Sequence, residues 1–115
     1  MSRQTFQQAT GKSIQQAFED YHRLNPKVFG YFEKYAFEAI NAGKKKISFK
    51  MIMNVIRWSI FIQTEEPTLF NMEGRKVKFR INDAYGSYYS RLFISKYPEH
   101  ADKVELRELR NERNQ

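Results

Sequence analysis

Apolar residues stand three or four positions apart along the first third of the chain, which predicts two helices. The first spans residues 13–24 and begins with a Ser-x-x-Gln capping box. The second spans residues 26–42, because Asn25 can cap a helix and Pro26 is tolerated at the first helical position, where its missing N–H costs no hydrogen bond. This second helix is apolar on two sides, so we expect it to be central, with Phe32 as a core anchor.

A third helix is predicted to follow a short lysine-rich turn, which completes a helix-turn-helix outline. Gly43 can adopt the left-handed conformation that ends a helix, and Ser48 can cap the next one. The third helix contains the most apolar run of the chain, and we expect it to be buried on most sides, with Trp58 as a second core anchor. Its polar side chains form one narrow stripe at positions i, i+4 and i+7, namely Lys50, Asn54 and Arg57.

The periodicity then changes to alternation, which favours extended structure. A strand is predicted to begin near Trp58, and residues 64–74 are predicted to form a long connection that ends in a turn. Residues 76–81 alternate strictly and predict a strand with one buried face. Its open face consists of Lys76, Lys78 and Arg80, and its apolar face of Val77, Phe79 and Ile81.

The last part of the chain predicts one more helix and a short docking segment. Asn82 can cap a helix that continues to about residue 97, because Pro98 forces a break there. Beyond this break, Val104 and Leu106 are expected to dock on the core.

The element order is that of a winged helix-turn-helix domain. We therefore predict an α+β fold, mainly helical and winged-helix-like, with a small β-hairpin and a C-terminal helix. A chain of 115 residues with 41% apolar content suits one domain, which we place at residues 12–107. Residues 1–11 are expected to form a flexible arm, and residues 108–115 a frayed, charged tail.

Charge is the strongest indication of function. The formal net charge is +7, and residues 44–80 contain nine Lys or Arg against three Asp or Glu. This asymmetry favours an anionic partner, although a solvated basic face without a partner is an open alternative. The chain has no cysteine, no apolar leader and no apolar run of 18 residues, so we expect a cytoplasmic protein without membrane contact.

The sequence offers no pattern typical of an enzyme. His22 and His100 lack the spacing of metal ligands. The pair Glu65 and Glu66 has no acid or base counterpart, and no serine stands in a Gly-x-Ser-x-Gly motif. We therefore expect no catalytic residues, no metal ligands and no cofactor.

Several runs within residues 12–107 are distinctive as a set. They are IRW at 56–58, FRINDAY at 79–85, YYSRLF at 88–93, Pro98, and LR at 106–107. In these runs the chain resembles a family of small uncharacterised proteins of phages, prophages and bacteria with winged-helix-like character. The resemblance implies no established activity for any residue. It implies a setting in phage or mobile-element biology, in the cytoplasm of a bacterial or phage-infected cell.

Two functions fit these observations. In the first, the domain binds nucleic acid and acts as a transcription regulator. Duplex DNA is the first candidate ligand and RNA the second. Phosphates would be contacted at the turn by Lys44, Lys45 and Lys46 and at the wing by Lys76, Lys78 and Arg80, and base edges would be read by Lys50, Asn54 and Arg57. In the second, the basic face docks on an acidic protein or ribonucleoprotein, as a phage counter-defence inhibitor or an assembly factor would. A homodimer is compatible with both.

Overall fold

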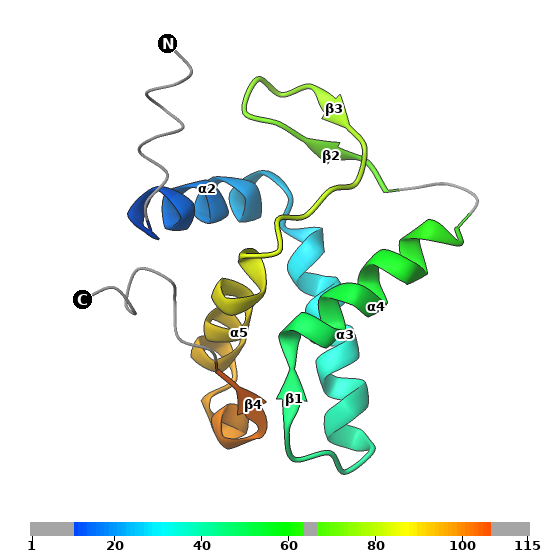
Figure 1. The fold of residues 1–115 in the computed structure, drawn as a ribbon, viewed down its shortest axis with the longest axis vertical. Helices are drawn as coiled ribbons and strands as arrows, with labels where there is room; N and C mark the ends of the chain where they lie inside the picture. Colours follow the sequence, from blue (N-terminus) through cyan, green and yellow to red (C-terminus); the bar gives the residue numbers. More distant parts are fainter. Residues whose placement is uncertain (1–10, 64–66, 107–115) are drawn as a thin grey trace.

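A computed structural model of the 115-residue chain describes residues 11–63 and 67–106, and it shows a mainly helical α+β protein (Figure 1). In chain order its elements are α2 (Gly11–Leu24), α3 (Lys27–Asn41), β1 (Ile47–Ser48), α4 (Phe49–Phe61), β2 (Leu69–Phe70), β3 (Lys76–Val77), α5 (Tyr85–Lys96), the 3-10 helix η1 (Pro98–Lys103) and β4 (Val104–Glu105). Strands β2 and β3 pair antiparallel as a hairpin, and β1 and β4 pair in parallel. The predicted class, a small hairpin and the helix that follows it are confirmed, but the first strand of the hairpin, β2, lies within the segment 64–74 that is predicted as a connection.

The core lies where α3, α4 and α5 meet, and α2 packs on α5 (Figure 1). Tyr89 of α5 is at its centre, with its ring stacked on Phe32 of α3 at 4.4 Å between centroids. Phe18 of α2 meets the Tyr89 ring edge-on at 4.7 Å, and Phe49 of α4 stacks on Phe32 at 5.5 Å. Since Phe32 is fully buried among aromatic rings of three helices, the prediction that it anchors the core is confirmed.

A parallel pair of very short strands joins the start of α4 to the C-terminal part of the described chain. Ile47 of β1 lies opposite Val104 of β4, and both side chains are buried. This pairing holds the start of α4 against the segment that follows η1. Val104 therefore docks on the core as predicted, whereas Leu106 is exposed and does not.

Two predicted helix starts differ from the structure, and at the third the predicted residue caps the turn before the helix rather than the helix itself, which begins at Tyr85. The described part of α2 already includes Gly11, so Ser13 lies within the helix rather than at its cap. Asn25 makes no capping hydrogen bond to α3, because its side chain is directed to the hairpin. Asn82 does cap the turn that leads into α5, since its Oδ1 accepts a hydrogen bond from Ala84 N at 2.8 Å.

The hairpin stands away from the helical body (Figure 1). Only Lys76 and Val77 of the predicted strand at residues 76–81 have strand conformation, and Val77 is exposed. The predicted buried face is limited to Phe79, which is half-buried, and Ile81, which is buried. The alternation extends to Val77, but a strand has a buried face only where a core lies beneath it.

Candidate functional site

Helix α4 begins as the sequence predicts. Gly43 has a φ of +84°, the left-handed conformation that ends α3, and residues 44–46 are exposed lysines. Ser48 then caps α4, because its Oγ accepts a hydrogen bond from Met51 N at 3.2 Å. Cations gain nothing from the dipole at the N-terminal end of a helix, so these lysines do not serve the stability of α4.

The outward side of α4 is an apolar row that solvent reaches. Its members stand at intervals of four, three and four residues, and they are Met51, Val55, Trp58 and, directly after the helix, Ile62. Their exposed fractions are 59, 39, 62 and 61%. These intervals are those of a and d positions in a helical heptad, so the four side chains lie along one side of the helix. We refer to these four residues as the α4 row.

Trp58 belongs to the α4 row, so the prediction that it anchors the core is wrong. The prediction of a strand beginning near it is also wrong, because α4 continues to Phe61. Both errors have the same cause. Helix α4 is apolar on two sides, and a sequence does not show which of two apolar sides faces the core. The four-three-four spacing is visible in the sequence, whereas the exposure depends on how the other elements pack.

The nine predicted nucleic-acid contacts do not form one patch. Figure 1 shows the turn that carries the lysines of residues 44–46 at one end of the molecule and the hairpin at the other. Lys50 and Asn54 are exposed on α4, between these ends. The predicted wing cations Lys76, Lys78 and Arg80 are exposed on the hairpin and the segment after it. Six of the cations therefore lie near the two ends of the molecule.

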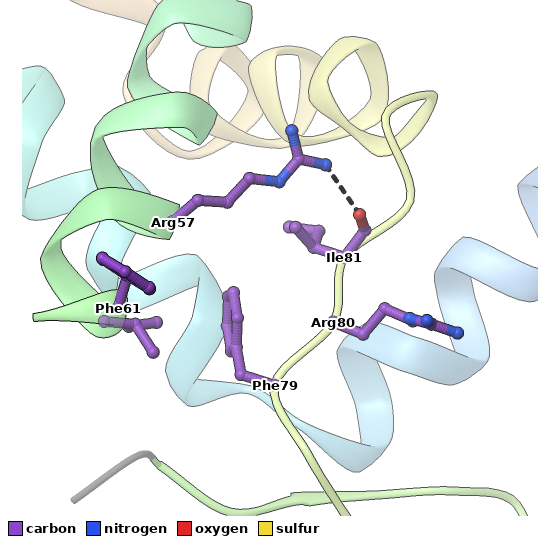
Figure 2. A pocket seen from close by; sticks show the side chains of 6 residues that line it. Arg57, Phe61, Phe79, Arg80 and Ile81 are labelled. Atoms are coloured by element: carbon purple, nitrogen blue, oxygen red, sulfur yellow. Dashed lines mark hydrogen bonds between the residues drawn. The ribbon is translucent and has the colours of Figure 1, made fainter. Parts of the chain in front are cut away.

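A pocket of about 420 Å³ opens beside the C-terminal end of α4 (Figure 2). Its lining comes from α4 and from the segment between β3 and α5, and it consists of Arg57, Ile60, Phe61, Phe79, Arg80 and Ile81. Ile60 and Ile81 are buried, while Phe61 is 74% exposed. In Figure 2 the Arg80 side chain extends away from Phe61, and the pocket surface is shared between apolar side chains and the two arginines.

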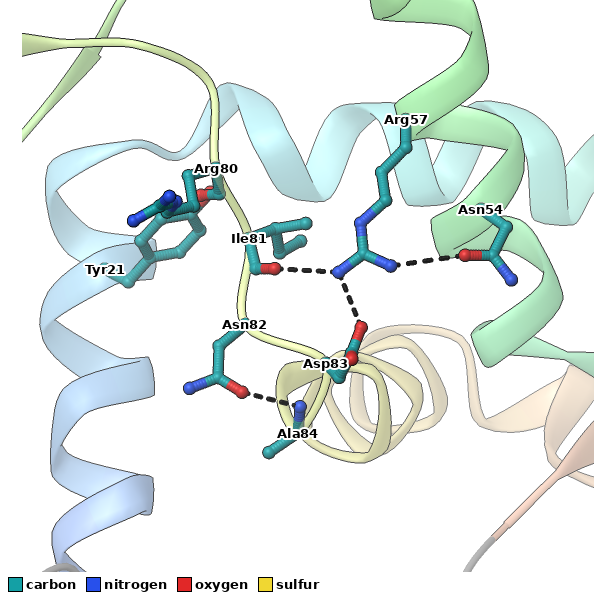
Figure 3. Close-up of polar contacts among 8 residues, drawn as sticks. All are labelled: Tyr21, Asn54, Arg57, Arg80, Ile81, Asn82, Asp83 and Ala84. Carbon is teal, nitrogen blue, oxygen red and sulfur yellow. Dashed lines mark hydrogen bonds and ion pairs between the residues drawn. The ribbon is translucent and has the colours of Figure 1, made fainter.

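Arg57 links α4 to the segment at the start of α5 through hydrogen bonds and an ion pair (Figure 3). Its Nη2 donates to the Ile81 carbonyl at 2.8 Å and to Asp83 Oδ1 at 2.6 Å, and its Nη1 donates to Asn54 Oδ1 at 3.2 Å. The sequence gives no signal for this pairing of residues 24 to 26 positions apart. Because Arg57 and Asn54 are engaged with the protein itself, only Lys50 of the predicted base-reading stripe has no partner among the described residues.

The hairpin is positioned by asparagine side chains. Asn25 pairs with Phe70 in both directions, donating from Nδ2 to its carbonyl at 3.1 Å and accepting from its N–H at 2.7 Å. Asn71 Oδ1 accepts from the N–H groups of Glu73 and Arg75 at 3.0 and 2.9 Å, and Gly74 has a φ of +78°. The predicted turn at residues 73–74 is thereby confirmed. The side chain of Asn25 replaces a neighbouring strand and holds β2 against α2 and α3.

His22 is a titratable residue that borders the aromatic core. Among the described residues no three His, Asp or Glu side chains are grouped to hold a metal ion. The ring of His22 stacks on Phe18 at 6.0 Å between centroids and meets Tyr89 edge-on at 6.1 Å. Burial lowers the pKa of His22, and its Nδ1 has no hydrogen-bond partner in the described part of the chain.

No protein-family model, no curated protein and no solved structure matches the chain. The resemblance to the phage and prophage family therefore depends on the sequence runs alone and stays a prediction. No helix in residues 11–63 or 67–106 is long and apolar enough to cross a membrane.

The α4 row, the pocket at its C-terminal end and exposed Lys50 at its N-terminal end form one side of the molecule that an elongated partner could cover. Exposed large apolar side chains that are contiguous on a helix are typical of sites where another protein binds.

Proposed function

We propose that the protein is a non-enzymatic binding module whose helix α4 docks on an acidic, amphipathic helix of another protein. The observation that carries this proposal is the α4 row, four large apolar side chains that are 39 to 62% exposed on one side of a capped helix. A helix-in-groove contact uses apolar residues at this kind of spacing. Burying the row would remove apolar surface from water at about 25 cal/mol per Å².

Charge identifies the chemical type of the partner. Helix α4 contains exposed Lys50 and no Asp or Glu, its Arg57 is paired with Asp83, and the turn before it contributes three further lysines. A partner surface with apolar residues bordered by carboxylates would match this distribution, while a basic surface would be repelled. Within the phage setting that the resemblance implies, such a module would serve as a counter-defence inhibitor or as an assembly factor.

A second candidate function is binding of nucleic acid through the hairpin. Its support is the exposure of four cations from the turn of the hairpin to the segment after it, namely Arg75, Lys76, Lys78 and Arg80. In a winged-helix arrangement the hairpin would be the wing and α4 the recognition helix. The α4 row is apolar, however, and gives duplex DNA few hydrogen-bonding groups, so this function ranks second.

The two candidates respond differently to salt and to substitution. For nucleic acid, replacing Lys76, Lys78 and Arg80 together by Gln should weaken binding to every duplex alike and reduce the salt slope by about 0.9 for each phosphate that the variant no longer neutralises. Binding of an acidic peptide should be little affected by this triple replacement. Equal duplex affinity of parent and triple variant would exclude the hairpin as a nucleic-acid site.

The test of the first candidate is fluorescence anisotropy of a labelled amphipathic peptide with leucine at a and d positions and glutamate elsewhere. The parent protein should bind it, and should not bind the matched peptide with lysine in place of glutamate. Val55→Asp should weaken binding about tenfold or more, because it places a carboxylate in the middle of the apolar contact. Ala17→Asp on exposed α2 makes the same charge change elsewhere and should leave the affinity unchanged. Equal affinities of the two variants would contradict the proposed site.

A further inference from the structure

The pocket and Lys50 lie on the same flank of α4. Successive residues of a helix are rotated by about 100°, which places Lys50, Asn54 and Phe61 side by side next to the α4 row. Lys50 is exposed near the first turn of α4, and Phe61 is its last residue and a wall of the pocket. The eleven steps from Lys50 to Phe61 correspond to about 16 Å along the helix axis.

The two ends of this flank have different chemistry. At the C-terminal end, Phe61 and Phe79 border the pocket over buried Ile60 and Ile81, which suits an apolar side chain. Arg57 at this end is held by its own hydrogen bonds, so it supplies little free charge. At the N-terminal end, Lys50 and the lysines of residues 44–46 are exposed. The flank therefore offers two phenylalanine rings beside Arg57 and Arg80 at one end, and exposed lysines at the other.

We propose that the partner helix is held at two points: a bulky apolar side chain in the pocket, and a group of carboxylates against Lys50 and the lysine turn about 16 Å away. This inference rests on the proposed function and adds a spacing to it. An α-helix that lies along α4 covers the same distance in about eleven residues. The partner segment should therefore carry its bulky apolar residue and its acidic group about eleven positions apart.

Other occupants of this surface fit less well. Residues 1–10 and 107–115 of this chain contain few apolar residues, which are Met1, Phe6, Ala9 and Leu109. A second copy would place one α4 and its lysine turn against another, and Lys50 and the lysines of residues 44–46 would then face their own counterparts. Like charges across an interface oppose association. A helix with carboxylates is the occupant whose charge is complementary.

The experiment compares two labelled helical peptides of identical composition, each with leucine at a and d positions and one phenylalanine. In the first peptide three glutamates are centred eleven residues from the phenylalanine, and in the second they are centred four residues from it. The parent protein should bind the first peptide about tenfold more tightly. Lys50→Glu and Phe61→Ser should each abolish this preference, and both sites are exposed, so folding should be retained. Arg75→Glu, an equal charge change on the exposed hairpin, should leave it intact.

Each outcome bears on a separate claim. If the parent binds both peptides equally while Val55→Asp weakens both, the two-point inference is wrong and the proposed function stands. If neither peptide binds the parent, the proposed function fails and the inference fails with it. If duplex DNA binds instead, with a steep salt dependence, the hairpin function becomes the better account.

Discussion

Arg57 and Trp58 are neighbours in the chain and have opposite structural roles. Arg57 is directed inward to the Ile81 carbonyl and Asp83, while Trp58 is directed outward on the α4 row. The polar residue therefore holds two elements together, and the apolar residue is exposed to solvent. Polarity alone would assign these roles the other way round, which is why a residue-by-residue interpretation of this helix fails.

Substitutions of Phe32 and Trp58 should distinguish a core residue from a surface residue. Phe32→Ala should lower the free energy of unfolding by about 3–5 kcal/mol, since it leaves a cavity among rings of three helices. Trp58→Ser should change the free energy of unfolding by about 1 kcal/mol or less, because most of its side chain is already in water. Urea denaturation followed by circular dichroism measures both. A drop of several kcal/mol with Trp58→Ser would place Trp58 in the core after all.

His22 should make stability depend on pH. Burial lowers its pKa below the ordinary 6.5, so the unfolded state takes up a proton at a higher pH than the folded state does. Its contribution to stability is therefore intact above about pH 7 and declines as the pH falls through 6.5 toward the lowered pKa. In His22→Phe this decline should be absent. The free energy of unfolding at several pH values between about 5 and 7 measures the effect for both proteins.

The free energy of unfolding could instead change with pH equally in the parent and in His22→Phe. This result would show that the imidazole titrates in the folded protein as it does in the unfolded chain. The aromatic surroundings of His22 and its Nδ1, which has no hydrogen-bond partner among the described residues, would then have no energetic consequence.

At the scale of elements, the hairpin is joined to the helical body through Leu69 of β2, whose side chain is buried in the core, and through Asn25. The side chain of Asn25 is buried and occupies both the N–H and the carbonyl of Phe70. The hydroxyl of Tyr21 adds one more attachment, donating to the Arg80 carbonyl at 2.8 Å. Two-stranded hairpins are marginally stable alone, so these side chains determine whether β2 and β3 persist.

Asn25→Leu should release the hairpin and leave the helices folded. The substitution removes both hydrogen bonds to Phe70, whose backbone groups must then find water or remain unpaired at about 1–3 kcal/mol each. Amide hydrogen exchange should accelerate in β2 and β3, while amides of α3 and α5 stay protected. Unchanged protection of the hairpin would mean that its antiparallel pairing and the burial of Leu69 suffice without Asn25. Faster exchange throughout the molecule would show that the hairpin and the core unfold as one unit.

The sequence predicts the start or the end of an element well where the signal lies in one residue or its close neighbours. Gly43, Ser48 and the turn at Gly74 are each identified by the conformation or the capping group that the residue type favours. Prediction fails where the deciding contact is distant. The sequence predicts Asn25 as a helix cap, whereas its side chain bonds to Phe70, 45 positions away. It predicts Arg57 as free for a ligand, whereas Arg57 bonds to the segment before α5.

The candidate site is predicted only in part for the same reason. The lysines of the turn and the hairpin are exposed, as their charge indicates. The sequence predicts burial for Trp58 and its row, because apolar residues on two sides of a helix give no sign of which side lacks a neighbour. The four-three-four spacing of the row is a usable signal, provided that exposure is kept as an alternative to burial.

At the scale of the whole molecule, the fold is thin. Its described residues extend over 49 × 44 × 20 Å, and 20 Å corresponds to about two helix diameters. Such a shape leaves α4 covered on one side by α3 and α5 and open on the other (Figure 1). The α4 row is therefore a consequence of the architecture, and the proposed partner helix would supply the layer that the described residues lack.

Fluorescence of Trp58 tests the central claim most directly, because it is the chain's one tryptophan and a member of the α4 row. In the free protein its emission should be that of a solvated indole and should be readily quenched by acrylamide. Addition of the leucine and glutamate peptide should shift the emission to shorter wavelength and protect it from the quencher, while the matched lysine peptide should change neither. An indole already shielded in the free protein, or one that stays open to the quencher in the presence of saturating acidic peptide, would contradict the account.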